Sequence, residues 1–282
     1  MTAKHSARMG WIGGIASHVL PLAALLLLAG AVMAAPQRVV SLNLCTDELA
    51  MLVAAEGQLH SVSDMALDEN VSVLAERARG LVANHGLAEE IFLMKPDLVL
   101  AGSYTARPTT DMLKRLGFRV ELFEPAMSFA DIRAQLRRIG ALLRREATAE
   151  NLVLRLDATL ARVQPPAGRV PLVAFYYANQ YTAGSGTLVD DVIRHSGSVN
   201  LGAKLGLSGT QKLSLEQMIM ARPDLIAMHN PYKAPALAYE AQLHPAFRAL
   251  SGESRLIDVP DRYTICGGPF TATAVRILAA SR

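Results

Sequence analysis

One sequence pattern occurs twice in this chain. The first copy, at 89–100, reads EEIFLMKPDLVL, and the second, at 216–227, reads EQMIMARPDLIA. In both copies a Glu stands seven residues before Pro-Asp-Leu and a basic residue precedes the Pro, at a constant offset of 127 residues. Each copy predicts a short amphipathic helix that ends near the Pro and leads into a buried strand. The repeat therefore indicates two similar α/β lobes, and binding sites often lie between such lobes.

The first 34 residues have the pattern of a secretory signal peptide. Two basic side chains precede an apolar run at 20–32, and Val32-Met33-Ala34 is a small-residue cleavage signal. We expect cleavage after Ala34 and a periplasmic mature protein. A membrane anchor is the alternative, but the run is short for a span of about 20 residues. Residue 31, after Leu-Ala-Gly, is Ala rather than Cys, so we expect no lipid anchor.

The composition of the mature chain limits the classes of partner and of fold that are expected for it. Lys4 and Arg8 leave with the signal, so the formal charge of +3 falls to +1, and we expect no nucleic-acid partner. With 51% hydrophobic and 19% charged residues, the chain can bury sizeable cores. Its two cysteines, Cys45 and Cys266, permit one disulfide in an oxidising compartment but are too few for a disulfide scaffold.

The order of predicted elements divides the mature chain into three parts. Strands alternate with helices at 35–127 and again at 164–282, which predicts two α/β lobes with parallel sheets. Between them, apolar residues keep helical spacing from Ile132 to Val163, and this predicts one long connecting helix at 128–163, either straight or bent near 145–148. In the repeats, Lys95 and Arg222 precede a proline, so we expect extended backbone at both.

Five segments, taken in order, resemble one family. They are RVVSLN at 38–43, KPDLV at 95–99, the long helix, YTAGSGT at 181–187, and Glu216 with RPDLI at 222–226. The chain resembles the periplasmic substrate-binding proteins of ABC importers for ferric siderophores and cobalamin, from about Arg38 to the end. The resemblance implies two Rossmann-like lobes joined by one rigid helix, with ligand in the cleft between them.

The resemblance also implies a function and partners. It indicates a monomeric binding protein, not an enzyme, which needs no cofactor, captures a metal chelate and delivers it to a membrane permease. A Glu at the tip of each lobe would pair with permease arginines, and Glu89 and Glu216 match those positions. Glu90 is an alternative to Glu89. We expect both docking residues at the end of each lobe opposite the ligand.

Ligands of open α/β sheets bind beyond the carboxyl ends of the strands. Tyrosines and arginines follow several predicted strands, and such side chains suit a bulky chelate with anionic oxygens. Because side chains alternate along a strand, we expect either Tyr176 or Tyr177 to pack under the sheet. The candidate ligand-binding residues are Asn43, Cys45, Thr46, Tyr104, Arg107, Tyr177, Tyr181, His229, Tyr232, Arg262 and Cys266.

The two cysteines both follow predicted strands, and three roles stay open for them. Cys45 and Cys266 can form a disulfide that ties the first strand's loop to the last loop, they can be separate buried thiols, or they can touch the ligand's metal. Alkylation with and without reductant separates these roles.

Several ligand classes and functions compete. A ferric siderophore is the first choice because arginines occur in the predicted loops; a corrinoid is second because the only Trp, Trp11, leaves with the signal. A Zn or Mn carrier of a related importer would use histidines such as His85 and His229, but none has metal-ligand spacing, so we expect no resident metal site. A secreted α/β enzyme lacks support because no nucleophile elbow or phosphate loop is visible. A sensor subunit with the same ligand is a further alternative.

Overall fold

A computed structural model describes residues 2, 34–230 and 236–282. The predicted signal peptide at 1–34 lies outside the described residues except for Thr2 and Ala34. Pro36 to Arg282 form one unit that holds both main sheets. Within the described part of the chain, no helix combines the length and the hydropathy needed to cross a membrane.

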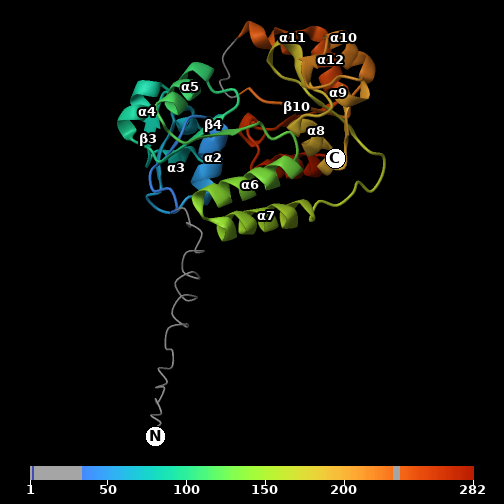
Figure 1. Ribbon diagram of the computed structural model, residues 1–282. Coiled ribbons are helices and arrows are strands. Elements are labelled where there is room, and N and C mark those ends of the chain that lie inside the picture. The colour runs from blue at the N-terminus through green and yellow to red at the C-terminus, as the bar shows by residue number, and fades with distance from the viewer. Residues whose placement is uncertain (1, 3–33, 231–235) are drawn as a thin grey trace. The chain divides into compact units, whose positions relative to one another are not determined.

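The first lobe is built on a five-stranded parallel sheet with the order β3-β2-β1-β4-β5 (Figure 1). Leu98 to Ala101 are all buried, as expected for a parallel strand covered on both faces. The elements are β1 (Val39–Ser41), α2 (Leu44–Val53), β2 (Leu59–Ser63), η2 (Asp64–Leu67), α3 (Ala75–Ala78), β3 (Val82–Asn84), α4 (Ala88–Met94), β4 (Leu98–Gly102), α5 (Arg107–Arg115) and β5 (Val120–Phe123).

The second lobe has a four-stranded parallel sheet with the order β11-β10-β6-β8, and a separate antiparallel pair, β7-β9. The parallel α/β lobes predicted from the sequence are thus confirmed. The elements are β6 (Leu172–Phe175), η3 (Ala178–Gln180), β7 (Tyr181–Ala183), α8 (Leu188–His195), β8 (Val199–Asn200), α9 (Leu201–Lys204), β9 (Thr210–Lys212), α10 (Leu215–Ala221), β10 (Leu225–Met228), η4 (Leu237–Tyr239), α11 (Glu240–Leu243), α12 (Pro245–Glu253), β11 (Arg255–Asp258), η5 (Asp261–Tyr263) and α13 (Thr271–Ala280).

The two copies of the repeat fold alike. In each copy a seven-residue helix, α4 or α10, leads through Pro-Asp into a central strand, β4 or β10. The helices end at Lys95 and Arg222, whose φ angles of 49° and 45° are left-handed. The expectation of extended backbone there was wrong. The following proline disfavours right-handed helical backbone, and a left-handed residue ends the helix while turning the chain sharply toward the strand.

The Asp of each Pro-Asp-Leu anchors the neighbouring strand. The Asp97 carboxylate accepts hydrogen bonds from the backbone N–H groups of Gln37 (2.6 Å) and Arg38 (3.0 Å), just before β1. The Asp224 carboxylate accepts one from the N–H of Leu172 (2.7 Å), at the start of β6. Because β1 pairs with β4 and β6 with β10, the repeated Asp fixes the same strand pairing in both lobes.

The single connecting helix predicted at 128–163 was wrong. The segment forms two helices, α6 (Phe129–Leu143) and α7 (Glu146–Leu160), which lie side by side (Figure 1). Arg144 has a left-handed φ of 57°, and the Arg145 N–H donates to the Gly140 carbonyl at 2.7 Å, so the chain reverses at this point. The periodic apolar pattern continued through the turn because both helices bury one face against the same core.

The facing sides of α6 and α7 explain their close, antiparallel packing. A Cβ atom at Gly140 would lie 2.5 Å from the Ala149 Cβ, so only glycine allows this approach. Two arginines of α6 form ion pairs with acids of α7 across the hairpin. Arg133 contacts Asp157 at 2.6 Å and Arg137 contacts Glu150 at 2.8 Å.

The hairpin is attached to both lobes. At the start of α6 the Phe129 N–H donates to the buried Asp191 carboxylate of α8 (2.7 Å), which belongs to the second lobe. At the end of α6, the Leu143 carbonyl accepts a hydrogen bond from the Gln58 side chain of the first lobe (3.0 Å). Helix α7 then returns along α6 toward α13. The chain therefore crosses between the lobes repeatedly.

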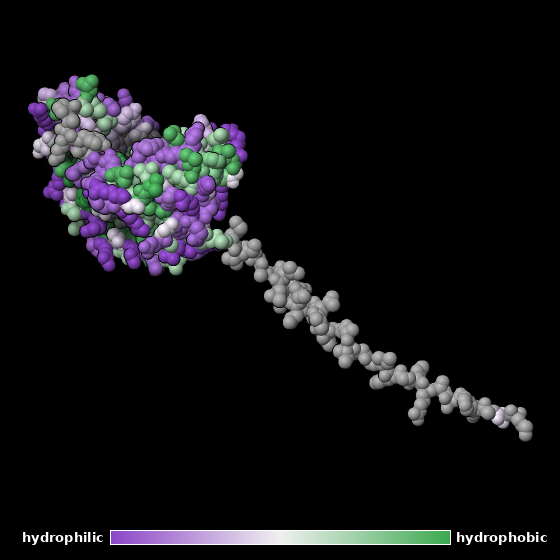
Figure 2. Space-filling model, turned by 90° about the vertical axis from the view of Figure 1, so that its left-hand side faces the viewer, coloured by the Kyte–Doolittle hydropathy of each residue, from purple (hydrophilic) through white to green (hydrophobic). Residues whose placement is uncertain are grey.

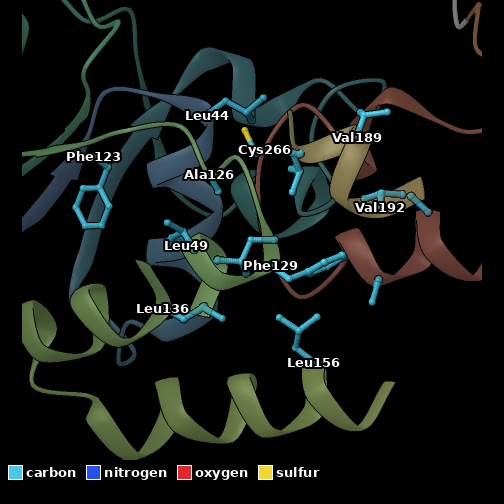
Figure 3. Packing of buried hydrophobic residues seen from close by; sticks show 14 of the residues in the cluster. Leu44, Leu49, Phe123, Ala126, Phe129, Leu136, Leu156, Val189, Val192 and Cys266 are labelled. Carbon is cyan, nitrogen blue, oxygen red and sulfur yellow. The ribbon is translucent and has the colours of Figure 1, made fainter. Parts of the chain in front are cut away.

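One hydrophobic core is shared by the two lobes. It contains buried side chains of α2, α6, α8 and α13, including Leu49, Phe129, Leu136 and Val192 (Figure 3). Each lobe has a second, smaller core on the outer face of its sheet, around Ile91 in the first lobe and around α10 and α12 in the second. The lobes thus share their inner faces rather than folding as separate globules.

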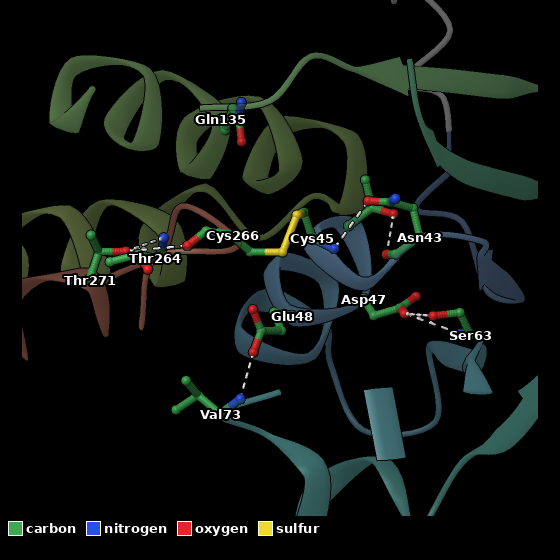
Figure 4. Close-up of a disulfide and its surroundings, with 12 residues drawn as sticks. Asn43, Cys45, Asp47, Glu48, Ser63, Val73, Gln135, Thr264, Cys266 and Thr271 are labelled. Carbon is green, nitrogen blue, oxygen red and sulfur yellow. Dashed lines mark hydrogen bonds between the residues drawn. A yellow bond between two sulfur atoms is a disulfide. The ribbon is translucent and has the colours of Figure 1, made fainter. Parts of the chain in front are cut away.

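The two cysteines are bonded to each other across the lobes. Cys45 lies in α2, Cys266 precedes α13, and their Cα atoms are 5.0 Å apart (Figure 4). Cys266 belongs to the shared core, and Cys45 packs against it. Of the three roles left open by the sequence, the structure shows the disulfide, which closes a separation of 221 residues.

Removal of this disulfide should destabilise the mature protein. For the Cys45→Ala/Cys266→Ala variant we expect the free energy of unfolding to fall by about 2–4 kcal/mol, because the crosslink restricts the unfolded chain. Urea denaturation with and without reductant measures the effect. Reductant should destabilise the wild type and leave the double variant unchanged; an equal response of the two proteins would contradict the prediction.

Candidate functional site between the lobes

A cavity of about 440 Å³ lies where β10 and β11 end, and residues of both lobes line it. This volume falls in the range of small-molecule sites, and the carboxyl ends of parallel strands are where such ligands bind. Most of its lining residues carry polar or charged side chains. They are Glu69, Asn70, His229, Asn230, Asp258, Pro260 and Arg262.

His229 is held in a defined orientation by an acid. Its Nδ1 lies 2.6 Å from the Asp258 carboxylate. A carboxylate accepts hydrogen bonds, so Nδ1 is the donor, and in the neutral form of the ring the lone pair is on Nε2. A carboxylate that fixes the imidazole in this way is also found behind metal-binding histidines.

Arg262 connects the two walls of the cavity. Its guanidinium donates to the Glu69 carbonyl at 3.1 Å, and it lies 5.5 Å from the centre of the Tyr263 ring. The adjacent Asp261 is partly buried, and burial raises the pKa of its carboxyl above the ordinary value, with the nearby Asp258 adding to the rise. The cavity lining therefore combines one fixed imidazole, one guanidinium and two carboxylates.

Of the candidate ligand residues that the structure describes, two, His229 and Arg262, line this cavity. Tyr104 and Arg107 follow β4 on the surface, where Tyr104 is 84% exposed. The Tyr181 ring, on β7, lies 5.9 Å from the Lys212 ammonium. Tyr232 lies outside the described residues.

Three further candidates, Asn43, Thr46 and Cys266, have structural roles. Asn43 caps α2 by accepting a hydrogen bond from the Cys45 N–H at 3.1 Å. Thr46 is buried and contacts the Ser41 hydroxyl at 2.7 Å, so it does not reach the cleft surface. Cys266 is likewise buried. Strand-end position alone did not separate exposed residues from capping and core residues.

The neighbouring tyrosines divide as strand alternation predicts. Tyr176 is fully buried and stacks on Phe247, and burial raises the pKa of its phenol to about 12. Tyr177 is half-buried, and burial, together with the nearby Asp261 charge, raises the pKa of its phenol. Only Tyr177 thus faces the loop that carries Arg262.

Glu69, Asn70, Asp258 and Pro260 were not predicted as site residues. Glu69 and Asn70 follow η2 in the irregular segment between η2 and α3. Applying the strand-end rule to β2 would have drawn attention to the segment after Ser63, although not to these two side chains. Asp258 is the last residue of β11, so it lies inside the strand rather than in the loop that follows it.

Two buried carboxyls of α2 hold the segment that carries Glu69. The Asp47 carboxylate accepts hydrogen bonds from the N–H (3.1 Å) and hydroxyl (2.5 Å) of Ser63, and Glu48 accepts one from the Val73 N–H at 2.8 Å (Figure 4). Burial raises the pKa of Asp47 to about 7 and that of Glu48 to about 8. One oxygen of each carboxyl has no hydrogen-bond partner among the described residues, which suits a protonated acid.

The candidate docking residues are both exposed. Glu89 and Glu216 lie in the first turns of α4 and α10. At the start of α10, hydrogen bonds from the backbone N–H of Glu216 itself and from the Ser214 hydroxyl lower the pKa of the Glu216 carboxyl. The rival Glu90 is engaged locally, since it accepts a hydrogen bond from the His85 N–H at 2.8 Å.

The expectation that these acids lie opposite the ligand end was wrong. Helix α4 connects β3 to β4, strands of one parallel sheet, so it runs back along the sheet and begins at the carboxyl ends of the strands. In the second lobe, Glu216 lines a separate cavity of about 400 Å³ together with Asn179 and Gln180, which follow β6. The loops after the strands and the candidate docking acids therefore share one edge of each sheet.

No group of three or more His, Cys, Asp and Glu side chains is arranged to hold a metal ion in the described ranges. His85 lies beside Glu90 (3.3 Å) and His229 beside Asp258, each with a partner from its own lobe.

Comparison with known proteins identifies the family. The profile of a family described as periplasmic binding protein matches residues 39–250, and the chain belongs to this family. Membership implies a location outside the cytoplasm and work with an ABC importer. The comparison with curated proteins gave no match.

Solved structures of the same fold agree with this membership. The fold is similar to the periplasmic heme-binding protein HutB of Vibrio cholerae, at 17% identity and a TM-score of 0.73, covering 86% of this chain and 98% of that one. The fold is also similar to that of a possible iron-binding periplasmic protein of Staphylococcus epidermidis, at 22% identity and a TM-score of 0.72. That match covers 88% of this chain and 99% of the other. The vitamin B12-binding protein BtuF of Vibrio cholerae matches at 20% identity and a TM-score of 0.63, covering 87% of this chain and 96% of that one.

Stability should decrease as the pH rises from about 5 to 8. The folded pKa values of Asp47 and Glu48 exceed the ordinary carboxyl values, so in this window the unfolded chain releases protons that the folded protein retains. Each group then lowers the free energy of unfolding by up to about 1.4 kcal/mol per pH unit. This decrease stops once the pH exceeds the pKa of the group in the folded protein.

Glu48→Gln removes one of these titrations. We compare the free energy of unfolding of the variant with that of wild type at each pH. The difference, variant minus wild type, should be about 1–4 kcal/mol larger at pH 8 than at pH 5. Urea unfolding at both pH values measures it, with the exposed Glu56→Gln as the matched control. A difference from wild type that is the same at both pH values would contradict the assignment.

Proposed function

We propose that this protein captures a metal chelate, with a ferric siderophore as the first choice, and delivers it to an ABC import permease. The observation that carries the proposal is the cavity between the lobes, which combines Arg262, the oriented His229 and residues of the first lobe. Arginine recognises anionic oxygens through a planar, permanently charged group, as an anionic ferric chelate requires. The shared core and the disulfide support a cleft that is formed before the ligand arrives.

A planar iron chelate is a second candidate that one observation favours. Because Asp258 holds Nδ1 of His229, the lone pair of Nε2 remains available to an iron that has an open coordination position. Cobalamin remains the alternative within the same class, although no Trp is present in the mature chain. A carrier of bare Zn or Mn receives less support, because His85 and His229 are each paired with one carboxylate rather than with a ligand cluster.

Binding of defined chelates tests the ligand proposal. Calorimetry of the mature protein with a ferric hydroxamate siderophore, heme and cobalamin should show micromolar or tighter binding of the siderophore. Arg262→Ala should weaken it by about tenfold or more, because a charge-assisted contact is lost. The exposed Arg155→Ala on α7 is the matched control.

The same titrations discriminate between the ligand classes. Heme binding that is abolished by His229→Ala, without siderophore binding, would replace the siderophore with a planar iron chelate. Absence of binding for all three chelates would refute the metal-chelate proposal.

Docking is proposed to use one exposed acid on each lobe, Glu89 and Glu216. Their carboxylates can pair with basic side chains of the permease at two separated points, which fixes the orientation of the complex. Glu90 is the weaker candidate because its carboxylate is occupied by His85.

Charge reversal tests the docking residues in cells. Glu89→Lys/Glu216→Lys should abolish chelate uptake and leave chelate affinity unchanged, because neither residue lines the cavity between the lobes. Glu56→Lys/Glu253→Lys, two exposed positions, makes the same change in net charge and should support normal uptake. Uptake that survives in the Glu89/Glu216 variant would refute this role.

A further inference from the structure

The repeat duplicates an apolar side chain as well as an acid. Leu93 follows Glu89 by four residues, and Met220 follows Glu216 by four residues. Residues four apart in a helix lie on one face, one turn from each other. Each copy of the repeat therefore presents a carboxylate and a large apolar side chain next to each other.

The fold does not use these apolar side chains. Leu93 is 76% exposed and Met220 is 84% exposed, whereas the repeat-related Ile91 and Met218 are both fully buried in the outer cores. Helices α4 and α10 are thus anchored through Ile91 and Met218, and their opposite faces carry Leu93 and Met220. A single exposed apolar residue is ordinary, but its recurrence at the same repeat position beside the same acid calls for a cause outside the fold.

The neighbourhood of Leu93 is hollowed and apolar. Leu93 and Glu89 line a groove of about 310 Å³ between α4 and α5, with Phe92, Met112 and Leu116 as apolar walls. These three walls are themselves more than two-fifths exposed. Figure 2 views the molecule from the side of α4 and shows hydrophobic side chains gathered on this face.

We propose that Leu93 and Met220 are apolar anchors of the docking surface, each buried by the permease beside the basic side chain that pairs with Glu89 or Glu216. This inference rests on the proposed docking role of the two acids. The duplicated Glu-and-apolar pair fits a partner that presents one site twice, as a two-fold symmetric pair of permease subunits does. The partner site must combine a cation with an apolar pocket.

The two kinds of contact make different contributions. Exposed carboxylates are screened by salt and give little affinity alone, but they orient the encounter. Burial of Leu93 and Met220 is insensitive to screening and retards dissociation. The complex should therefore keep part of its affinity at high salt, and that part should depend on the apolar anchors.

Binding to the cognate permease complex in lipid nanodiscs tests the proposal at low and high salt. Leu93→Ser and Met220→Ser should each weaken binding by about tenfold at both salt concentrations, the loss expected when a large apolar side chain is no longer buried. Glu89→Gln/Glu216→Gln should weaken binding mainly at low salt. Leu154→Ser, at a 58% exposed position of α7, is the matched control and should bind like wild type.

The outcomes separate this inference from the docking proposal. If both Ser variants bind like Leu154→Ser while the Gln variant is impaired, the apolar anchors are refuted and the docking role of the acids stands. If none of the variants is impaired, the docking proposal itself fails. Leu93→Lys gives a second test at this position, because a cation facing the basic partner site should weaken binding further; thermal unfolding confirms that each variant is folded.

Discussion

The apolar core shared by the two lobes is the constraint on which the rest of the structure depends. Helices α2, α6, α8 and α13 bury their side chains in one cluster, so the lobes cannot separate without exposing it to water. The α6–α7 hairpin crosses this interface repeatedly, and the disulfide closes it beside α2. Hinged domains usually turn about flexible crossings. This arrangement instead favours a preformed cleft and small lobe motion.

The repeat illustrates what local sequence can and cannot predict. Its helix, proline and buried strand followed from residue type and spacing, and both copies folded as expected. The left-handed backbone of Lys95 and Arg222 did not follow, because non-glycine residues adopt it only when the surrounding structure requires it. The same limit explains the hairpin: Arg144 reverses the chain without a Gly or Pro to mark the turn, and an apolar period continued across it. The role of Asp97 and Asp224 depends on strand pairing, which no short pattern encodes.

The candidate site was predictable in outline and less so in detail. Topology placed the cavity at the carboxyl ends of the strands, and His229 and Arg262 follow from that rule. Thr46 and Cys266 satisfy the same rule but are buried, since strand-end position does not specify the direction of a side chain. Glu69 and Asn70 come from an irregular segment held by buried hydrogen bonds to Asp47 and Glu48. Such contacts join residues that are distant in sequence, so periodicity contains no information about them.

Parallel topology has a further consequence for how binding and delivery are connected. In a parallel sheet the loops after the strands and the first turns of the return helices meet at one edge. Glu89 and Glu216 therefore lie at the same edge of each lobe as the cavity residues. A change in the cavity does not have to be transmitted through a lobe to reach them. If the partner distinguishes a loaded cleft from an empty one, small lobe motion places the distinguishing change near that edge. The segment that carries Glu69 can undergo such a change. It contacts Arg262 of the second lobe on one side and the buried carboxyls of α2 in the first lobe on the other. A chelate that displaces the Arg262 contact would change the edge at which the proposed partner docks.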